Sequence, residues 1–136
     1  MAPTLINIDH IHLYVTNRIA AQAWYAEVLG LSPVPELLSW ADDGGPLTIA
    51  NADASIHLAL FERAPQPNRA TIAFAVTAAG LLTWQQHLGQ VLSSVPALVD
   101  HQLSWSLYFT DPDGNPFEIT TYEYKEVIAL QVPSLG

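Results

Sequence analysis

Short runs of alternating hydrophobic and polar residues lie along the chain, and two longer segments between them have hydrophobic residues at helical spacing. Alternation predicts strands, and the helical spacing predicts helices. The segment 18–29 is a predicted helix because Asn17 can cap its N-terminus and Gly30 can end it. A second helix is predicted at 79–88. Strands are predicted at 7–16, 32–38, 47–51 and 55–61, and again at 70–76, 91–99, 104–109 and 117–122.

The two halves repeat the same order of elements. Shifting the chain by 61 positions places HIHLYVT (10–16) on TIAFAVT (71–77), and SIHLALFE (55–62) on PFEITTYE (116–123). The sequence therefore predicts an α+β fold, one domain built from two β-α-β-β-β modules. Module one covers about 5–62 and module two about 70–123, and no structure is predicted for the tail, 124–136.

Composition limits the cellular setting. Half of the 136 residues are hydrophobic, so a core can form, yet no run reaches the ~20 apolar residues of a membrane span. The first residues lack the basic and apolar regions of a secretion signal. There are no cysteines, which excludes disulfides and thiolate chemistry. We therefore expect a cytoplasmic protein that spans no membrane.

Charge limits the partners. The formal net charge is −9, and only four residues are Lys or Arg. A chain this acidic is repelled by phosphate backbones, so no nucleic-acid binding is expected, and strongly anionic substrates are disfavoured. A divalent cation would be attracted.

Strand alternation gathers the polar side chains on one face. Side chains point alternately to the two faces of a strand, which places His10 and His12 together, and His57 and Glu118 each between packed neighbours. The 61-residue shift pairs His10 with Thr71 and His57 with Glu118. A pseudo-twofold axis would bring these four positions together. Two imidazoles and a carboxylate suit a divalent transition metal, so His10, His57 and Glu118 are the predicted metal ligands.

Each of these residues also has a plain structural reading. His10 could be a buried, hydrogen-bonded histidine, Glu118 a surface carboxylate on an edge strand, and His57 a polar lining residue. The same kind of reading makes His87 a solvated surface residue and Tyr14, Tyr108 and Tyr122 packing residues. It makes Trp24 and Trp84 the core anchors of the helices, and Glu62 and Glu123 solvated strand ends.

Two segments resemble the vicinal oxygen chelate superfamily, which includes glyoxalase I, extradiol dioxygenases, and fosfomycin- and bleomycin-resistance proteins. They are IDHIHLYVTN…AWYAEVLGL, similar to its opening strand and helix, and LYFTDPDGNPFEITTY, similar to its closing hairpin. The resemblance covers roughly residues 5–123. It implies paired modules that form a half-open mixed β-barrel around a metal or ligand cavity, with the helices outside, in a homodimer.

The resemblance assigns roles to individual residues. His10 and Glu118 match the family's first-strand and last-strand ligands, and His57 falls where glyoxalase I has a glutamate ligand. Thr71 departs from the family, which usually has a second histidine there, so its predicted role is substrate binding. DHQLSWSLYF (100–109) resembles extradiol sequences that place a histidine and a tyrosine near the substrate, roles that fall here to His101 and Tyr108.

The remaining residues predicted for the site share the cavity face. His12 and His101 are the candidates for moving a proton, and with Tyr108 they form the predicted catalytic set. Tyr14 and Tyr122, with Thr71, are the predicted substrate-binding residues.

Two functions follow, and a third has less support. One is a metal-dependent dioxygenase, lyase or isomerase that holds Fe, Mn, Ni or Zn and acts on a small oxygen-chelating substrate such as an aromatic diol. The alternative is a metal-free small-molecule binding protein of the bleomycin-resistance type, whose acidic surface would suit a cationic ligand. A purely structural dimerisation module gives no reason for the three ligand-type residues. Pairing of modules within one chain or between two chains stays open.

Overall fold

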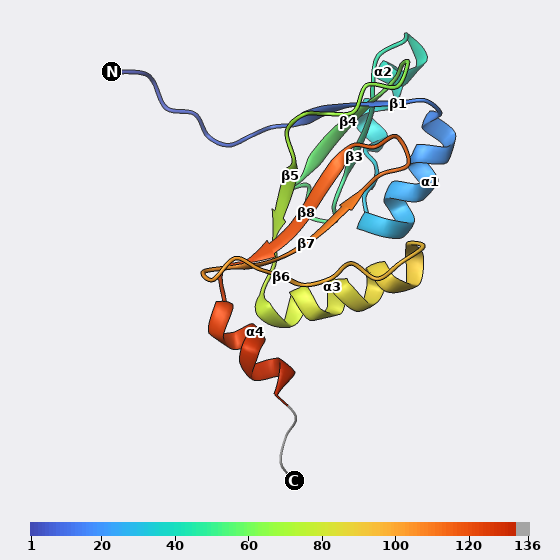
Figure 1. The fold of residues 1–136 in the computed structure, drawn as a ribbon. Coiled ribbons are helices and arrows are strands. Elements are labelled where there is room, and N and C mark those ends of the chain that lie inside the picture. The colour runs from blue at the N-terminus through green and yellow to red at the C-terminus, as the bar shows by residue number, and fades with distance from the viewer. Residues whose placement is uncertain (133–136) are drawn as a thin grey trace. The chain divides into compact units, whose positions relative to one another are not determined.

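The computed structural model describes residues 1–132. The chain divides into two compact units, residues 1–67 and a second unit that begins at Asn68. Each unit contains a four-stranded mixed sheet and a long helix (Figure 1). The predicted α+β fold of two β-α-β-β-β modules is confirmed.

Module one begins with β1 (Ile11–Val15) and α1 (Arg18–Leu29). It continues with β2 (Ser32–Pro33), the 3₁₀ turn η1 (Pro35–Leu37), α2 (Leu38–Asp42), β3 (Leu47–Ala50) and β4 (His57–Glu62). The sheet order is β1-β4-β3-β2, with β1 parallel to β4 and the other pairs antiparallel. Helix α1 contacts β2 and β4, and Tyr25 of α1 is fully buried with Leu13, Ile49 and Leu60.

Module two contains β5 (Ile72–Ala75), α3 (Ala78–Val91), β6 (Val99–Asp100), β7 (Trp105–Thr110), β8 (Pro116–Thr121) and α4 (Tyr124–Gln131). Its sheet order, β5-β8-β7-β6, repeats the pattern of module one. Helix α3 contacts β7, β8 and α4. Its residues Leu81 and Leu88 are fully buried, as is Leu107 of β7.

The two long helices begin in the same way. The side chain of Asn17 accepts a hydrogen bond from the Ala20 amide, and that of Thr77 accepts one from the Gly80 amide, each at 3.0 Å. Such side-chain caps satisfy amides that have no partner within the helix. Gly30 ends α1 in the left-handed conformation, with φ 69°, as predicted.

Two glutamates add a second cap at the equivalent place in each module. The Arg18 amide at the start of α1 donates to Glu62 Oε2 at 3.0 Å, and the Ala78 amide at the start of α3 donates to Glu123 Oε1 at 2.7 Å. Both glutamates are exposed, as predicted, but the prediction missed their hydrogen bonds to the helices. A carboxylate at a helix N-terminus is favoured by the helix dipole as well as by the hydrogen bond.

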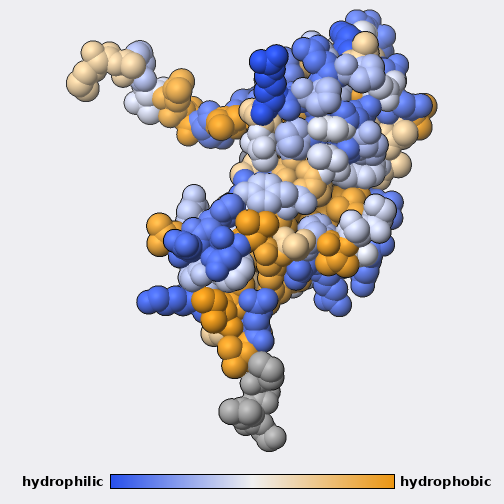
Figure 2. Space-filling view, viewed as in Figure 1, coloured by the Kyte–Doolittle hydropathy of each residue, from blue (hydrophilic) through white to orange (hydrophobic). Residues whose placement is uncertain are grey.

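The first predicted strand is too long at its N-terminal end. Residues 1–10 have no secondary structure, because β4, the only strand of module one that pairs with β1 within the described residues, begins at His57, and its pairing begins at Ile11 with Leu58. The segment carries exposed apolar side chains, including Leu5, Ile6 and Ile8, and its apolar surface is visible in Figure 2. Alternation alone could not reveal that a strand partner is missing.

Two other predicted strands are mostly absent. At 32–38 the strand stops at Pro33 and the chain turns into η1 and α2, because Pro33 and Pro35 cannot donate to a sheet and Pro35 suits the first turn of a helix. At 91–99 only β6 is a strand, because α3 extends to Val91 and the following residues are irregular. The tail, left without a prediction, begins with α4.

The tryptophans are not the main helix anchors. Trp24 and Trp84 are half-buried, and the fully buried aromatic residue of α1 is Tyr25, which Trp24 contacts edge-on at 4.9 Å between ring centroids. His87, predicted to be solvated, is half-buried against Trp84.

No helix within residues 1–132 is long and apolar enough to cross a membrane.

Candidate functional site

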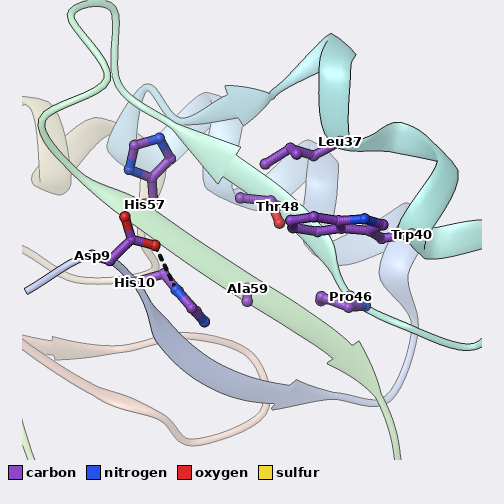
Figure 3. A pocket seen from close by; sticks show the side chains of 8 residues that line it. All are labelled: Asp9, His10, Leu37, Trp40, Pro46, Thr48, His57 and Ala59. Atoms are coloured by element: carbon purple, nitrogen blue, oxygen red, sulfur yellow. Dashed lines mark hydrogen bonds and ion pairs between the residues drawn. The ribbon is translucent and has the colours of Figure 1, made fainter.

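A pocket of about 170 Å³ opens within module one (Figure 3). We call it the module-one pocket. It is lined by Asp9, His10, Leu37, Trp40, Pro46, Thr48, His57 and Ala59. In Figure 3 the two histidines and Asp9 lie at one end, whereas Trp40, Leu37, Pro46 and Thr48 lie at the other. The pocket thus has a polar end with two predicted metal ligands and a largely apolar end.

His10 lies between two polar partners. Asp9 Oδ2 accepts from His10 Nδ1 at 2.8 Å, and His10 Nε2 lies 3.0 Å from His12 Nε2. A carboxylate can only accept, so it fixes the proton of neutral His10 on Nδ1 and leaves the lone pair on Nε2. His12 then donates to that lone pair, and its ring stacks on His10 and packs against Phe61.

His57 is the first residue of β4, opposite Ala50 of β3. It is half-buried, and the next residue, Leu58, points into the core, as alternation predicts. Within residues 1–132 the His57 side chain makes no hydrogen bond, ion pair or ring contact. Its imidazole is therefore available to a ligand of the pocket.

Glu118 lies in the middle of β8, paired with Ala73 of β5 on one side and Tyr108 of β7 on the other. Its Oε2 accepts from Ser106 Oγ at 2.6 Å. Ser106 is fully buried, and its Oγ lies 2.9 Å from Thr120 Oγ1. Ser106 holds one carboxylate oxygen in place, and the carboxylate also interacts with the Tyr108 hydroxyl on the neighbouring strand.

His101 and Tyr108, both predicted to lie near the substrate, contact one another. His101 Nε2 is 2.8 Å from the Tyr108 hydroxyl, and the two rings meet edge to face. Asp100 shapes the turn that carries His101, because its Oδ1 accepts from the Gln102 amide at 2.7 Å while Gln102 adopts a positive φ of 70°. Burial, and then the neighbouring Glu118 carboxylate, raise the pKa of Tyr108 above its ordinary value of 10.0.

The predicted substrate-binding residues lie at the edges of these groups. Tyr14 is half-buried on β1, edge-on to Phe61 at 6.3 Å between centroids. Thr71 is exposed and directly precedes β5. Tyr122, directly after β8, is 81% exposed. Neither Thr71 nor Tyr122 makes a side-chain hydrogen bond or ring contact with the predicted ligands of its own module within the described chain.

Each module brings together part of the predicted site. Module one joins His10, His12 and His57 in or beside one pocket, and module two joins Glu118, Tyr108 and His101 on one sheet face. Among the residues described, no group of three or more His, Asp or Glu side chains is arranged to hold a metal.

Several pocket residues escaped the sequence-based prediction. Trp40 and Leu37 lie on α2 and η1, where a strand followed by a loop was expected. The signal was present, since Pro35 followed by Glu36 is typical of a helix start. Asp9 could have been found as the neighbour of His10, whereas nothing in the sequence marks Thr48.

Two of the four cationic residues are engaged in structure. Arg18 donates to the carbonyls of Gly45 and Ala41 at 2.9 and 3.1 Å, and Arg63 donates to that of Gly44 at 3.1 Å. They fix the segment between α2 and β3. None of the eight described residues that line the module-one pocket is Lys or Arg.

The fold matches several solved structures. An integron cassette protein from the mobile metagenome of the Halifax Harbour sewage outfall superimposes with a TM-score of 0.72 at 21% identity, covering 86% of this chain and 99% of that chain. A glyoxalase family protein from Bacillus anthracis gives a TM-score of 0.68 at 22% identity, covering 90% and 99%. The fosfomycin resistance protein FosX from Listeria monocytogenes, complexed with Mn(II) and sulfate, gives 0.64 at 13% identity, covering 95% and 100%. At these identities the likeness concerns the fold.

A family model matches most of the sequence. No curated protein sequence matches the chain. The model of the Glyoxalase/Bleomycin resistance protein/Dioxygenase superfamily matches residues 7–119, which cover most of both modules and include His10, His57 and Glu118. The chain belongs to the Glyoxalase/Bleomycin resistance protein/Dioxygenase superfamily.

Proposed function

We propose that this protein is a divalent-metal-dependent enzyme that acts on a small oxygen-chelating substrate, with His10, His57 and Glu118 as the metal ligands. The observation that supports it most is the polar end of the module-one pocket, where two imidazoles line one cavity. FosX, a relative in fold, is complexed with Mn(II), which adds support for a divalent metal in this superfamily.

The donor set suits such a metal. Imidazole nitrogens and a carboxylate bind Fe, Mn, Ni and Zn, and three protein ligands leave positions for substrate oxygens. The ligands are also supported by their neighbours. Asp9 holds His10 in the tautomer whose Nε2 carries the lone pair, which a metal would take in place of the His12 contact, and Ser106 holds one oxygen of Glu118. Hydrogen bonds of this kind orient metal ligands in proteins.

The reaction would divide its tasks among the residues. When bound, the metal supplies Lewis-acid stabilisation of substrate oxygens. Proton movement falls to His101, whose Nε2 contacts the Tyr108 hydroxyl, and to His12 beside His10. A neutral imidazole can accept and return a proton near pH 7. Tyr14, Thr71 and Tyr122 are proposed to contact the substrate.

The charge of the protein limits the class of substrate that it can bind. The net charge of −9 and the engagement of Arg18 and Arg63 with backbone carbonyls leave few cations for an anion. We therefore expect an uncharged substrate with two adjacent oxygens, such as an aromatic diol, rather than a phosphonate or a glutathione adduct.

Elemental analysis of untagged protein tests the proposal. We expect about one equivalent of Fe, Mn, Ni or Zn per chain, and its loss in His10→Ala, His57→Ala and Glu118→Ala. Because Thr71 is not a proposed ligand, Thr71→Ala serves as the control that keeps its metal. A metal-free wild type after anaerobic addition of Fe(II) or Mn(II) would refute the enzyme and favour a binding protein of the same superfamily.

We also propose that the protein is a homodimer, and the same variants test whether chains share ligands. If Glu118 completes the site of its partner, coexpressing His57→Ala with Glu118→Ala chains restores part of the metal, because one site per heterodimer is intact. If each chain holds its own metal, the mixture stays empty. Light scattering measures the mass of the assembly.

A further inference from the structure

Trp40 is placed on the pocket without any structural role of its own. Its side chain is 53% exposed, and no residue of α2, all of which the structure describes, is buried. Across residues 1–132 the indole N–H donates no hydrogen bond, and no other aromatic ring packs against it. Leu37, three positions earlier, lines the same pocket. An exposed, unpacked tryptophan is informative because large aromatic side chains are normally packed.

The backbone around Trp40 is nevertheless firmly held. The Trp40 carbonyl accepts from the Gly45 amide at 3.0 Å, and Arg18 and Arg63 bind the carbonyls of Ala41, Gly44 and Gly45. A Cβ at position 45 would lie 2.6 Å from the Trp40 carbonyl oxygen, so this turn requires a glycine. A fixed backbone carrying an open indole face is preorganised for a ligand, which reduces the ordering cost of binding.

Thr48 supplies an unused polar group at the same end. The residue is 5% exposed, and its side chain lines the pocket next to Trp40 (Figure 3). Its hydroxyl has no hydrogen-bond partner among the described residues. Every buried side-chain N or O atom of the described residues has a hydrogen-bond partner, so the unbonded Thr48 hydroxyl is one that the pocket leaves accessible to a ligand or water.

Size and charge restrict the occupant. A volume of about 170 Å³ is close to that of cavities that hold one benzene ring, and well below that of drug-sized sites. Asp9 supplies a carboxylate to the lining, and none of the lining residues is Lys or Arg, which disfavours anions.

We propose that the module-one pocket binds an uncharged single-ring aromatic group, with its ring against the Trp40 indole and a polar substituent hydrogen-bonded to the Thr48 hydroxyl. Trp40 and Thr48 are then specificity-determining residues. The idea that the ring belongs to the substrate rests on the proposed function, but ring binding itself needs no metal.

Phenol is the test probe, titrated into metal-stripped, ¹⁵N-labelled protein, with the Trp40 indole N–H signal as the readout. Trp40→Phe identifies that signal by its absence. We expect saturable shifts at Trp40, and cyclohexanol, which has the hydroxyl without the aromatic ring, to bind about fivefold more weakly. Benzoate, a single-ring anion, should bind more weakly than phenol. Shifts confined to other residues, or equal binding of cyclohexanol, would overturn the proposal.

Variants separate the two contacts. Trp40→Ala should weaken phenol binding by about tenfold or more, whereas Trp40→Phe keeps most of it. Thr48→Val, which keeps the shape and removes the hydroxyl, should weaken it about fivefold. Circular dichroism checks that each variant is folded. Unchanged phenol affinity in folded Trp40→Ala would disprove the site.

The outcome is distinguishable from that of the metal experiment. Trp40→Ala should keep its metal, and Glu118→Ala, which removes a proposed ligand outside the pocket, should keep its phenol affinity. If the wild type holds metal but does not bind phenol, only the aromatic-ring proposal is rejected. If it binds phenol but holds no metal, only the enzyme proposal is rejected.

Discussion

In module one Glu62 accepts from the first amide of α1, and in module two Glu123 accepts from the first amide of α3. The residues that build the scaffold thus repeat, as do the sheet orders. The residues proposed for the site do not. His57 is replaced by Glu118 at the equivalent position, and His12 by Ala73. The comparison suggests that the scaffold is held by the shared caps and cores, which leaves the cavity face of each module free to differ.

The turns that precede β4 and β8 also differ. In module one Asn51 bonds the Ile56 amide and the Ser55 hydroxyl in a largely exposed turn. In module two Asp111 and Asn115 are buried, and Asp111 accepts from two backbone amides and from the Asn115 side chain. Asn115 in turn accepts from the Asn68 amide at the start of the module. We infer that the second turn contributes more to stability.

Replacing Asp111 in the second turn and Asn51 in the first should give the largest difference in the cost to stability between the modules. Asp111→Ala leaves three donors, two of them buried, without their acceptor and should lower the free energy of unfolding by about 2–4 kcal/mol. Asn51→Ala, in the exposed turn, should cost less than about 1 kcal/mol. Urea denaturation followed by circular dichroism measures both. Equal costs would contradict the inferred difference.

A histidine can be introduced in module two at the position equivalent to His10. Thr71 occupies the position equivalent to His10, so Thr71→His adds a fourth proposed ligand. We expect metal affinity to rise on the order of tenfold, measured by competition with a chelator. Ala73→His, two positions along on β5, is the matched control and should change little. If both variants tightened metal binding equally, the predicted grouping of positions 10, 57, 71 and 118 around one metal would be wrong.

The repeated caps should have equal, smaller effects. Glu62→Ala and Glu123→Ala each remove a carboxylate acceptor at a helix N-terminus, and each should cost about 0.5–2 kcal/mol of stability. Thermal unfolding of both variants measures the costs. A large cost in only one module would contradict the predicted equality and show that the glutamate cap is redundant in the other module. Glutamine at either position should retain part of the effect, because it keeps an acceptor and loses the charge.

The sequence predicted the fold well wherever local signals and tertiary packing agree. Helix 18–29 was predicted with both ends correct, because Asn17 and Gly30 are strong local signals. Strand 7–16 was predicted too long, because its alternation continues past the point where β4 can pair with it. Pairing depends on residues far along the chain, and a local pattern does not contain it.

The residues that line the module-one pocket could be predicted only in part, for the same reason. The 61-residue repeat pointed to His10 and His57. The family resemblance added His101 and Tyr108, and His101 Nε2 lies 2.8 Å from the Tyr108 hydroxyl. Trp40 and Thr48 were missed. Their position on the pocket depends on how α2 folds back beside β3, which no repeat in the sequence encodes.

The smallest expected effect is that of the Glu118 carboxylate, which has no equivalent in module one, on the pKa of Tyr108. The pKa of Tyr108 is raised first by burial and then by Glu118, so Glu118→Gln should lower it toward 10.0 without reaching that value. In wild type the neutral phenol is favoured in the folded state, so its contribution to stability is complete below pH 10.0 and is lost as pH rises through the higher folded pKa. Ultraviolet titration of metal-free protein, with Tyr108→Phe to assign the signal, measures the shift. Tyr124 is the internal control, because its pKa is raised mainly by its hydrogen bond with Asp100 and should not respond to Glu118→Gln. An unchanged Tyr108 would mean that burial alone sets its pKa, and that the Glu118 charge does not act on the residue opposite it.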